Sequence, residues 1–396
     1  MRYVTALGAA IAILAASVAA GANAASSSPI TIGCQCDLTG AAAFAGIAGQ
    51  YGIQMAISQI NAHGGVDGRK LKLVTEDSAT TPDGGTLAAR KLIQQDHAQA
   101  IISVASSGAS IPAAQVASQL KTVYIASAAG DPRVLYPFSK YVYRGDSVNI
   151  AASAAMMVKL AKQRNAKAIA VMTDTSLAYA VTEKSLFLKD ASKAGLNIVT
   201  AKTWSSTDTD FTSQVQAVKS AKPDWIIIMA YPPATAKFMI QLRNAGVTTP
   251  VLGDQSLPVP DLISLGGSAV NGMELLYIGS QVLSDKTGAM GKFVAFFNKM
   301  FPNVDHTAYP NSETVWAYAD TFVLADAIRR AGANFTSDSL VTALDKTRGF
   351  VAGKGKVFYY AFPVGLPRTY NPNDHEGTRV LGLLEVKGGQ LVPVTP

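Results

Sequence analysis

The sequence predicts an α/β fold of two doubly wound parallel-sheet lobes. Short apolar segments alternate with amphipathic ones along nearly the whole chain, which is typical of parallel sheets covered by helices on both faces. The 396 residues exceed what one hydrophobic core usually organises, so two lobes are expected. The alternation breaks near 141–149, 279–287 and 349–356, which suits a chain that passes between the lobes three times.

The first predicted βαβ unit is the most informative part of the chain. An apolar strand at 30–34 leads into a small-residue loop at 39–49. An amphipathic helix follows and ends at the glycine pair 64–65, after which a second strand occupies 71–74. The loop has little side-chain bulk, so free backbone N–H groups at the helix start can reach a small anionic ligand.

The later strands and helices are predicted from the same alternation of short apolar segments with amphipathic ones. Strands are expected at 101–104, 123–126, 142–144, 168–173, 197–203, 225–229, 250–252 and 273–278. Helices are expected at 84–95, 111–120, 150–163, 180–194, 210–220, 235–245, 259–265, 292–300, 312–331 and 338–346. The segment from Arg379 to Val392 reads as a closing hairpin.

The first 24 residues are predicted to be a secretory signal peptide. Arg2 precedes an apolar run, and Ala22-Asn23-Ala24 fits a small-residue cleavage site. A membrane anchor is the alternative, but the run is short and Ala-rich and the cleavage motif follows directly. No later stretch reaches 18 uninterrupted apolar residues, so we expect a soluble protein exported to the periplasm.

Composition and motifs argue against several classes of function. The net charge is +7, but the basic residues are scattered, unlike the stripe with interleaved aromatics that nucleic acids require. Cys34 and Cys36 fall on one face of a strand, where a disulfide would be strained, so we predict two buried thiols. The four histidines are far apart, and nucleotide-binding, nucleophile-elbow and zinc-protease motifs are absent. We therefore predict no enzyme, no cofactor and no metal site.

Ligands of open parallel sheets bind outside the carboxyl ends of the strands, so candidate residues are sought in the strand-end loops. The strongest loop is 103–110, in which Ser106 or Ser107 can cap the next helix and Pro112 is expected in its first turn. An anion there would meet hydroxyls, backbone N–H groups and the positive end of the helix dipole. Capping alone is the structural alternative, and the two roles can coexist.

Several spaced motifs in the first unit carry a family resemblance. They are Leu38-Thr39-Gly40, Gly52, Ala56, Ile60-Asn61, Gly64-Gly65, Gly68-Arg69-Lys70, Leu73 and Glu76-Asp77. The chain resembles the type I periplasmic solute-binding proteins of branched-chain amino-acid ABC transporters. The resemblance implies a monomer that closes two lobes on a small ligand and delivers it to an inner-membrane permease. It also implies one lobe of 29–144 plus 280–350 and another of 145–279 plus 351–396.

The resemblance also implies the site residues. The family binds its ligand carboxylate at a loop matching Ser106 and Ser107, and with a turn matching Ala128, Ala129 and Gly130. That turn lacks the family's threonine, so only its backbone contacts are carried over. Aromatic side chains are expected to line the same site, and they are Phe44, Tyr179 and Tyr231. Phe44 lies among alanines without a helical stripe of apolar partners, which favours a pocket wall.

The pair Asp254 and Gln255 leaves the ligand class open. Amino-acid binders of the family commonly place an acid here to meet the ligand ammonium, which needs a charged partner when desolvated. If Asp254 faces the cleft, an α-amino acid fits; if Gln255 does, an aromatic or aliphatic acid without an amine fits. A surface position for Asp254 is a further alternative. A ligand sensor that docks to a receptor is the remaining alternative function, which sequence cannot separate.

Overall fold

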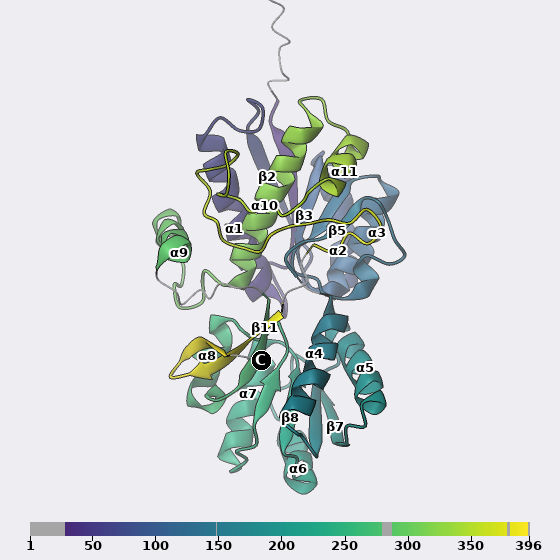
Figure 1. The fold of residues 1–396 in the computed structure, drawn as a ribbon, viewed down its shortest axis with the longest axis vertical. Helices are drawn as coiled ribbons and strands as arrows, with labels where there is room; N and C mark the ends of the chain where they lie inside the picture. Colours follow the sequence, from purple (N-terminus) through teal and green to yellow (C-terminus); the bar gives the residue numbers. More distant parts are fainter. Residues whose placement is uncertain (1–27, 148, 279–286, 378–380, 395–396) are drawn as a thin grey trace, which may run out of the picture.

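The computed structural model describes residues 28–147, 149–278, 287–377 and 381–394. The predicted signal peptide at 1–24 lies outside the described residues. The chain forms two α/β lobes arranged end to end, with the first strands in one lobe and the middle of the chain in the other (Figure 1). The predicted fold class is confirmed, because each lobe is built on a largely parallel sheet.

The first lobe has a five-stranded parallel sheet of order β2-β1-β3-β4-β5. Its strands are β1 (Ile30–Cys36), β2 (Leu71–Asp77), β3 (Ala100–Val104), β4 (Val123–Ala126) and β5 (Val142–Arg144). One face packs against α1 (Ala43–Ala62), α10 (Ser312–Ala331) and α11 (Ser337–Asp345). The other face packs against α2 (Pro82–Gln94) and α3 (Ser107–Gln119). A short η1 (Pro132–Val134) precedes β5, and α9 (Gly288–Met300) lies against the first of these cores.

The second lobe has a seven-stranded sheet of order β12-β11-β10-β9-β8-β6-β7. The parallel strands are β6 (Ile169–Asp174), β7 (Ile198–Trp204), β8 (Trp225–Met229), β9 (Val251–Gly253) and β10 (Glu274–Ile278). The hairpin β11 (Leu381–Lys387) and β12 (Gln390–Val394) adds two antiparallel strands at the edge, as predicted. Helices α4 (Ile150–Gln163) and α5 (Ala178–Lys193) pack on one face. The other face carries α6 (Thr212–Ala221), α7 (Pro232–Asn244), α8 (Pro260–Gly266) and η2 (Gly267–Val270).

Several helices begin earlier than the sequence pattern indicates, and two of these starts, those of α1 and α3, lie close to the site. The predicted loop at 39–49 becomes helical from Ala43, so Phe44 lies in the first turn of α1. Helix α3 begins at Ser107, which places Pro112 inside the helix and not in its first turn. Both helix starts are rich in Ala, Gly and Ser. Such small residues form no apolar stripe, so hydrophobic periodicity cannot locate the first turn.

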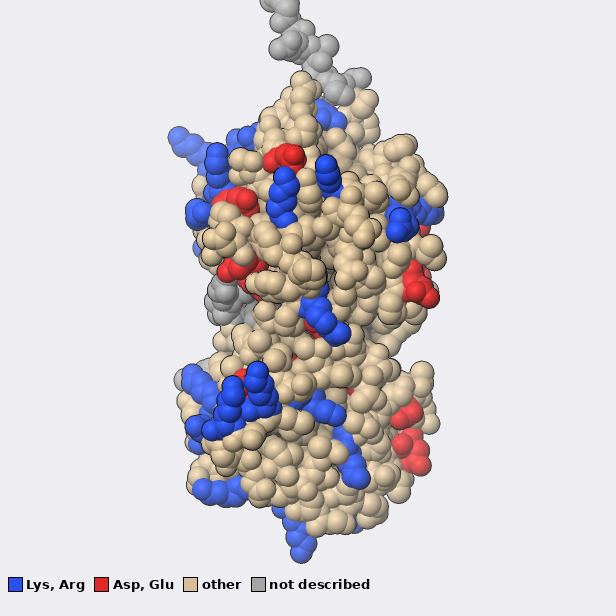
Figure 2. All heavy atoms as spheres, turned by 90° about the vertical axis from the view of Figure 1, so that its right-hand side faces the viewer, with Lys and Arg blue, Asp and Glu red and all other residues tan. Residues whose placement is uncertain are grey.

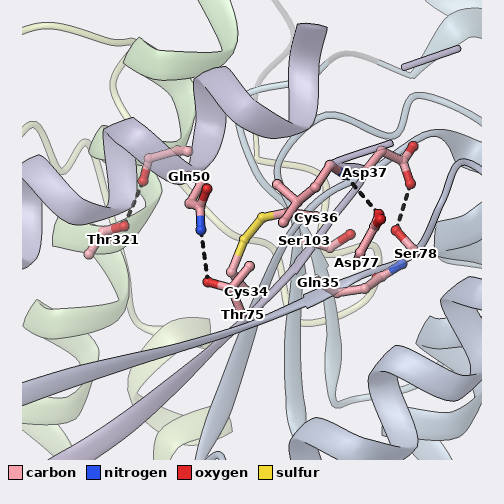
Figure 3. The surroundings of a disulfide bond; sticks show 12 residues. Cys34, Gln35, Cys36, Asp37, Gln50, Thr75, Asp77, Ser78, Ser103 and Thr321 are labelled. Carbon is pink, nitrogen blue, oxygen red and sulfur yellow. Dashed lines mark hydrogen bonds between the residues drawn. A yellow bond between two sulfur atoms is a disulfide. The ribbon is translucent and has the colours of Figure 1, made fainter. Parts of the chain in front are cut away.

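The two cysteines form a disulfide, so the prediction of two free thiols was wrong. Figure 3 shows the Cys34 and Cys36 side chains on the same face of β1, as alternation along a strand requires. Their Cα atoms are 5.6 Å apart, within the range that disulfides span. Both residues are buried in the core of the first lobe.

The last crossing between the lobes comes later than expected. Residues 351–377 were assigned to the second lobe, but Ala352, Phe358 and Tyr370 are buried in the core of the first. The Phe358 ring lies 5.3 Å from that of Phe322 on α10. The segment is largely irregular, so its lobe is set by these aromatic contacts and not by periodicity. Residues 351–370 therefore pack with the first lobe, whereas β11 belongs to the sheet of the second.

Two buried arginines form ion pairs that join the segments passing between the lobes. Arg368 Nη2 lies 2.7 Å from Asp146 Oδ1 and 2.8 Å from Asp320 Oδ1. Arg144 Nε donates to Glu376 Oε2 over 2.7 Å, and its other nitrogens donate to the carbonyls of Ala129 and Asp131. The first and third crossings are thus joined by ion pairs that are out of contact with water.

Helices α1 and α10 cross in close contact at Gly52. A Cβ atom on Gly52 would lie 2.1 Å from the backbone oxygen of Thr314. We therefore expect Gly52→Ala to lower the free energy of unfolding by about 1–3 kcal/mol, because the two helices must move apart. The matched control is Gly108→Ala in α3, where the nearest atom to such a Cβ is 3.8 Å away. It should be neutral or stabilising by up to about 1 kcal/mol in the same urea titration, and equal losses in both variants would contradict the steric explanation.

Candidate ligand cleft

A cavity of about 50 Å³ lies where the carboxyl ends of the strands of the two lobes face each other. Eight of the ten predicted site residues line it: Phe44, Ser106, Ser107, Ala128, Gly130, Tyr179, Tyr231 and Gln255. Two of the ten, Ala129 and Asp254, are buried behind the lining. The lining residues that the sequence did not indicate are Ala42, Ala45, Ala105, Ser147, Ser256, Ile278, Glu313 and Trp316.

The N-terminus of α3 supplies hydrogen-bond donors at the first-lobe side of the cavity. Ser106 is the N-cap of α3, as predicted, and its Oγ accepts a hydrogen bond from Ala109 N. Ser107 Oγ accepts from Asp131 N over 3.2 Å. The first N–H groups of a helix have no acceptor within the helix, and the helix dipole is positive there. This end of the cavity therefore suits a carboxylate.

The carboxyl group of Asp37 fixes the loop that leads into α3. Its Oδ2 accepts from Ser106 N over 2.7 Å, and its Oδ1 accepts from Ser78 Oγ over 2.6 Å. Burial raises the pKa of Asp37 above its ordinary value, and these hydrogen bonds oppose the rise. The loop is thus held by a buried acceptor directly behind Ser106.

The turn at 128–131 adjoins α3. It is fixed on the side away from the cavity by residues of the first segment that passes between the lobes. Ala129 faces away from the cavity, because its carbonyl oxygen accepts from the Arg144 guanidinium and from Ser147 Oγ. Ala128 and Gly130 on either side line the cavity. The structure thus brings Ala128 and Gly130 to the cavity, whereas the buried carbonyl group of Ala129 fixes the turn from the other side.

Three aromatic rings form a wall that joins the two lobes. The Phe44 ring on α1 meets the Tyr231 ring edge-on, with 5.4 Å between ring centroids. Tyr231 and Tyr179, both in the second lobe, have their centroids 5.4 Å apart. All three are buried and line the cavity. An apolar or aromatic ligand group would find its contacts here.

Asp254 does not line the cavity, because its carboxylate accepts hydrogen bonds within its own turn. Its Oδ1 accepts from Ser256 N over 2.8 Å and from Ser256 Oγ, the pattern of an Asx turn. Its Oδ2 accepts from the hydroxyl group of Tyr179 over 3.1 Å. Burial raises the pKa of Asp254 to about 7, and Glu183, buried nearby, has its pKa raised as well. Gln255 lines the cavity instead, and its Oε1 has no hydrogen-bond partner among the described residues.

Glu313 is the acidic residue of the cavity lining, and the sequence analysis missed it. It lies in the first turn of α10, after the capping box of Asn311 and Thr314. Its Oε2 accepts from Ser312 Oγ over 3.0 Å, and burial raises its pKa to about 7. The loops that follow strands do not contain Glu313 or Trp316, because both residues lie at the start of a helix. The signal that could have found them is the Asn311–Thr314 capping pattern that follows α9.

The described residues contain no group of three or more His, Cys, Asp or Glu side chains arranged to hold a metal ion. Within the same residues, no helix combines the length and apolar character needed to cross a bilayer. Lys and Arg side chains are distributed over both lobes on the face in Figure 2, and the surface narrows between the lobes.

Comparisons with known proteins agree with this architecture. The sequence model of the family described as "Periplasmic binding protein" matches residues 29–390. A relative in Brucella melitensis biotype 1, the Leu/Ile/Val-binding protein homolog 3, is 25% identical over 83% of this chain and 87% of its own length.

Two solved structures share the fold. A leucine binding protein LivK from Thermotoga maritima MSB8 superimposes with a TM-score of 0.78 and 25% identity, covering 92% of this chain and 98% of that one. A solute binding protein of an ABC transporter from Rhodopseudomonas palustris BisB5, in complex with 3,4-dihydroxybenzoic acid, has a TM-score of 0.77 and 23% identity. It covers 93% of this chain and 97% of its own.

Proposed function

We propose, from the premise that this chain belongs to the periplasmic binding protein family, that it captures a small carboxylate-bearing solute for an ABC transporter. The first candidate solute is an amino acid of the branched-chain class, since a Leu/Ile/Val-binding protein homolog is among the relatives. In this proposal a monomer exported to the periplasm closes its lobes on the solute and delivers it to a membrane permease.

One observation carries the proposal: a single cavity is lined by the N-terminus of α3 from the first lobe and by Tyr231 and Gln255 from the second. A ligand in this place contacts both lobes only when they are closed. Its binding free energy therefore favours the closed arrangement. The donors of α3 suit a carboxylate, and the wall of Phe44, Tyr179 and Tyr231 suits an apolar or aromatic tail.

A second candidate ligand is an aromatic or aliphatic acid without an amine. It is favoured by the position of Gln255, which lines the cavity while Asp254 is turned into its own loop. The relative from Rhodopseudomonas palustris with 3,4-dihydroxybenzoic acid in its site demonstrates such a ligand on this fold. The same arrangement of donors at α3 would hold the carboxylate in both cases.

A thermal-shift screen of the mature protein tests the proposal. Leucine, isoleucine, valine and phenylalanine are compared with benzoate, 4-hydroxybenzoate and short aliphatic acids. A ligand that binds the native state raises the melting temperature by mass action. A rise with members of either set supports capture of a small carboxylate, and no rise with either set would contradict it.

The carboxylate position is tested with Ser106→Ala combined with Ser107→Ala. We expect the double variant to bind any ligand found in the screen about 5- to 150-fold more weakly, because hydrogen bonds to a charged group contribute about 1–3 kcal/mol. Isothermal titration measures the change. The control is Ser118→Ala in the last turns of the same helix, whose hydroxyl donates to Ser139 and not to the cavity. Equal affinities of the double variant and the control would remove the assignment.

A further inference from the structure

The electrostatic character of the cavity is uneven from one end to the other. Donors gather at the α3 end, where Ser106 and Ser107 lie. The lining also contains two acceptors, the carboxylate of Glu313 and the Oε1 atom of Gln255. Among the described residues that line the cavity, none is Lys, Arg or His. The lining therefore offers an anion only dipoles and neutral donors, whereas it offers a cation the negative charge of Glu313 when that carboxyl is ionised.

The two acceptors are buried, and neither has a positively charged partner among the described residues. Gln255 is 8% exposed, and its Oε1 has no hydrogen-bond partner in the described part of the chain. Glu313 is 5% exposed and accepts the Ser312 hydroxyl, but no ion pair within the described ranges neutralises it. A buried acceptor without a donor costs free energy, and a buried carboxylate without a cation costs more. A ligand that brings donors and a positive charge to this point removes both costs.

We propose that Glu313, with Gln255 Oε1 as a second acceptor, binds the ammonium group of an α-amino acid ligand. This inference rests on the proposed function and selects the first of its two ligand classes. The acid comes from the first turn of α10 in the first lobe, and not from the strand end where Asp254 lies. A zwitterion places its carboxylate at α3 and its ammonium at Glu313, so no charge in the cavity is left without a partner. An acid without an amine would add a second negative charge near Glu313 with no cation to oppose either.

The protonation of Glu313 makes the inference testable without any variant. Burial, with a smaller contribution from the nearby Asp261 carboxyl on α8, raises its pKa to about 7. The other titratable groups that interact with it are the phenols of Tyr231, Tyr277 and Tyr309, whose pKa values are raised in part by Glu313. Only the ionised carboxylate attracts an ammonium. Amino-acid affinity should therefore fall as the pH falls through about 7, whereas binding of an acid without an amine should strengthen.

The experiment uses ligand pairs that differ only in the amine: L-leucine with 4-methylpentanoate, and L-phenylalanine with 3-phenylpropanoate. Affinities are measured by isothermal titration from pH 5.5 to 8.5 for the wild type, Glu313→Gln and the control Glu385→Gln on β11. In Glu313→Gln we expect amino-acid affinity to fall about 10- to 100-fold at pH 8 and to lose its pH dependence. The amine-free partner should bind this variant as well as, or better than, the wild type. The control should match the wild type throughout.

The possible failures are distinguishable. If the wild type binds amino acids and Glu313→Gln binds them equally well with the same pH profile, the role of Glu313 is wrong and the proposed function stands. If only the amine-free acids bind, the inferred ligand class is wrong and the second candidate ligand stands. If no member of these pairs and no other acid of the thermal-shift screen binds, the proposed function itself is contradicted. Thermal unfolding of each variant verifies that it is folded at the temperature of the titration.

Discussion

Arg368→Met is expected to lower the free energy of unfolding by about 3–5 kcal/mol at pH 8, because the substitution leaves buried carboxylates without their cation. Arg368 is fully buried and lies within 2.8 Å of Asp320 and 2.7 Å of Asp146. Burial raises the pKa of Asp320, and Arg368 opposes that rise. Removing the guanidinium therefore raises the pKa of the carboxyl further in the folded state.

The pH dependence of this loss has a definite sign. A carboxyl whose pKa is higher in the folded than in the unfolded state destabilises the protein above that pKa, and the loss shrinks as protonation proceeds. The deficit of Arg368→Met should thus be smaller at pH 5.5 than at pH 8 in urea titrations. Arg329→Met is the matched control, since the Arg329–Asp326 pair is partly exposed and should contribute less than about 1 kcal/mol. A similar loss in both variants, or a deficit independent of pH, would contradict the explanation.

Arg144→Met is expected to weaken ligand binding as well as stability. The side chain is buried, pairs with Glu376 and donates to the carbonyls of Ala129 and Asp131. Its removal should lower the free energy of unfolding by about 3–5 kcal/mol and release the turn whose neighbours Ala128 and Gly130 line the cavity. We expect an affinity loss of about tenfold or more, which corresponds to about 1.4 kcal/mol or more.

The control for that variant separates stability from binding. Arg243 also donates to two backbone carbonyls, those of Val247 and Thr249, but it lies in the second lobe outside the cavity lining. Arg243→Met should lower stability while leaving the affinity within about twofold of the wild type. Isothermal titration measures the affinity of both variants, and urea unfolding measures their stability. If Arg144→Met keeps wild-type affinity, the turn does not hold the ligand through Arg144.

The sequence predicted most elements because each has a strong local pattern. The strands Val123–Ala126 and Trp225–Met229 lie where expected, since continuous apolar runs between helices mark buried parallel strands. The starts of α1 and α3 were missed because Ala, Gly and Ser carry no stripe. The lobe of residues 351–377 was assigned wrongly, because an irregular segment carries no period and only its aromatic contacts place it.

The site residues that strand order brings together could be predicted from the sequence. Those whose position depends on local side-chain hydrogen bonds or on distant packing could not. Strand-end loops of parallel sheets converge, so Ser106, Ser107 and Tyr231 could be brought together from the order of elements. The choice between Asp254 and Gln255 depended on an Asx turn within three residues, which no periodicity reports. Glu313 lies on a helix more than 200 residues beyond the α3 loop in the sequence, and it reaches the cavity only through tertiary packing.

Because the chain passes between the lobes more than once, the core of each lobe includes residues from late in the sequence. The core of the first lobe joins α1 to α10 and to residues as late as Tyr370, and the sheet of the second lobe is completed by β11 and β12. The first lobe therefore cannot complete its core before Tyr370 has been synthesised, and the second cannot complete its sheet before β11 and β12 have been. Contacts so distant in sequence form slowly, because a long loop must be closed before they contribute. If the chain is exported unfolded to the proposed periplasmic location, this delay favours translocation before the cores are complete.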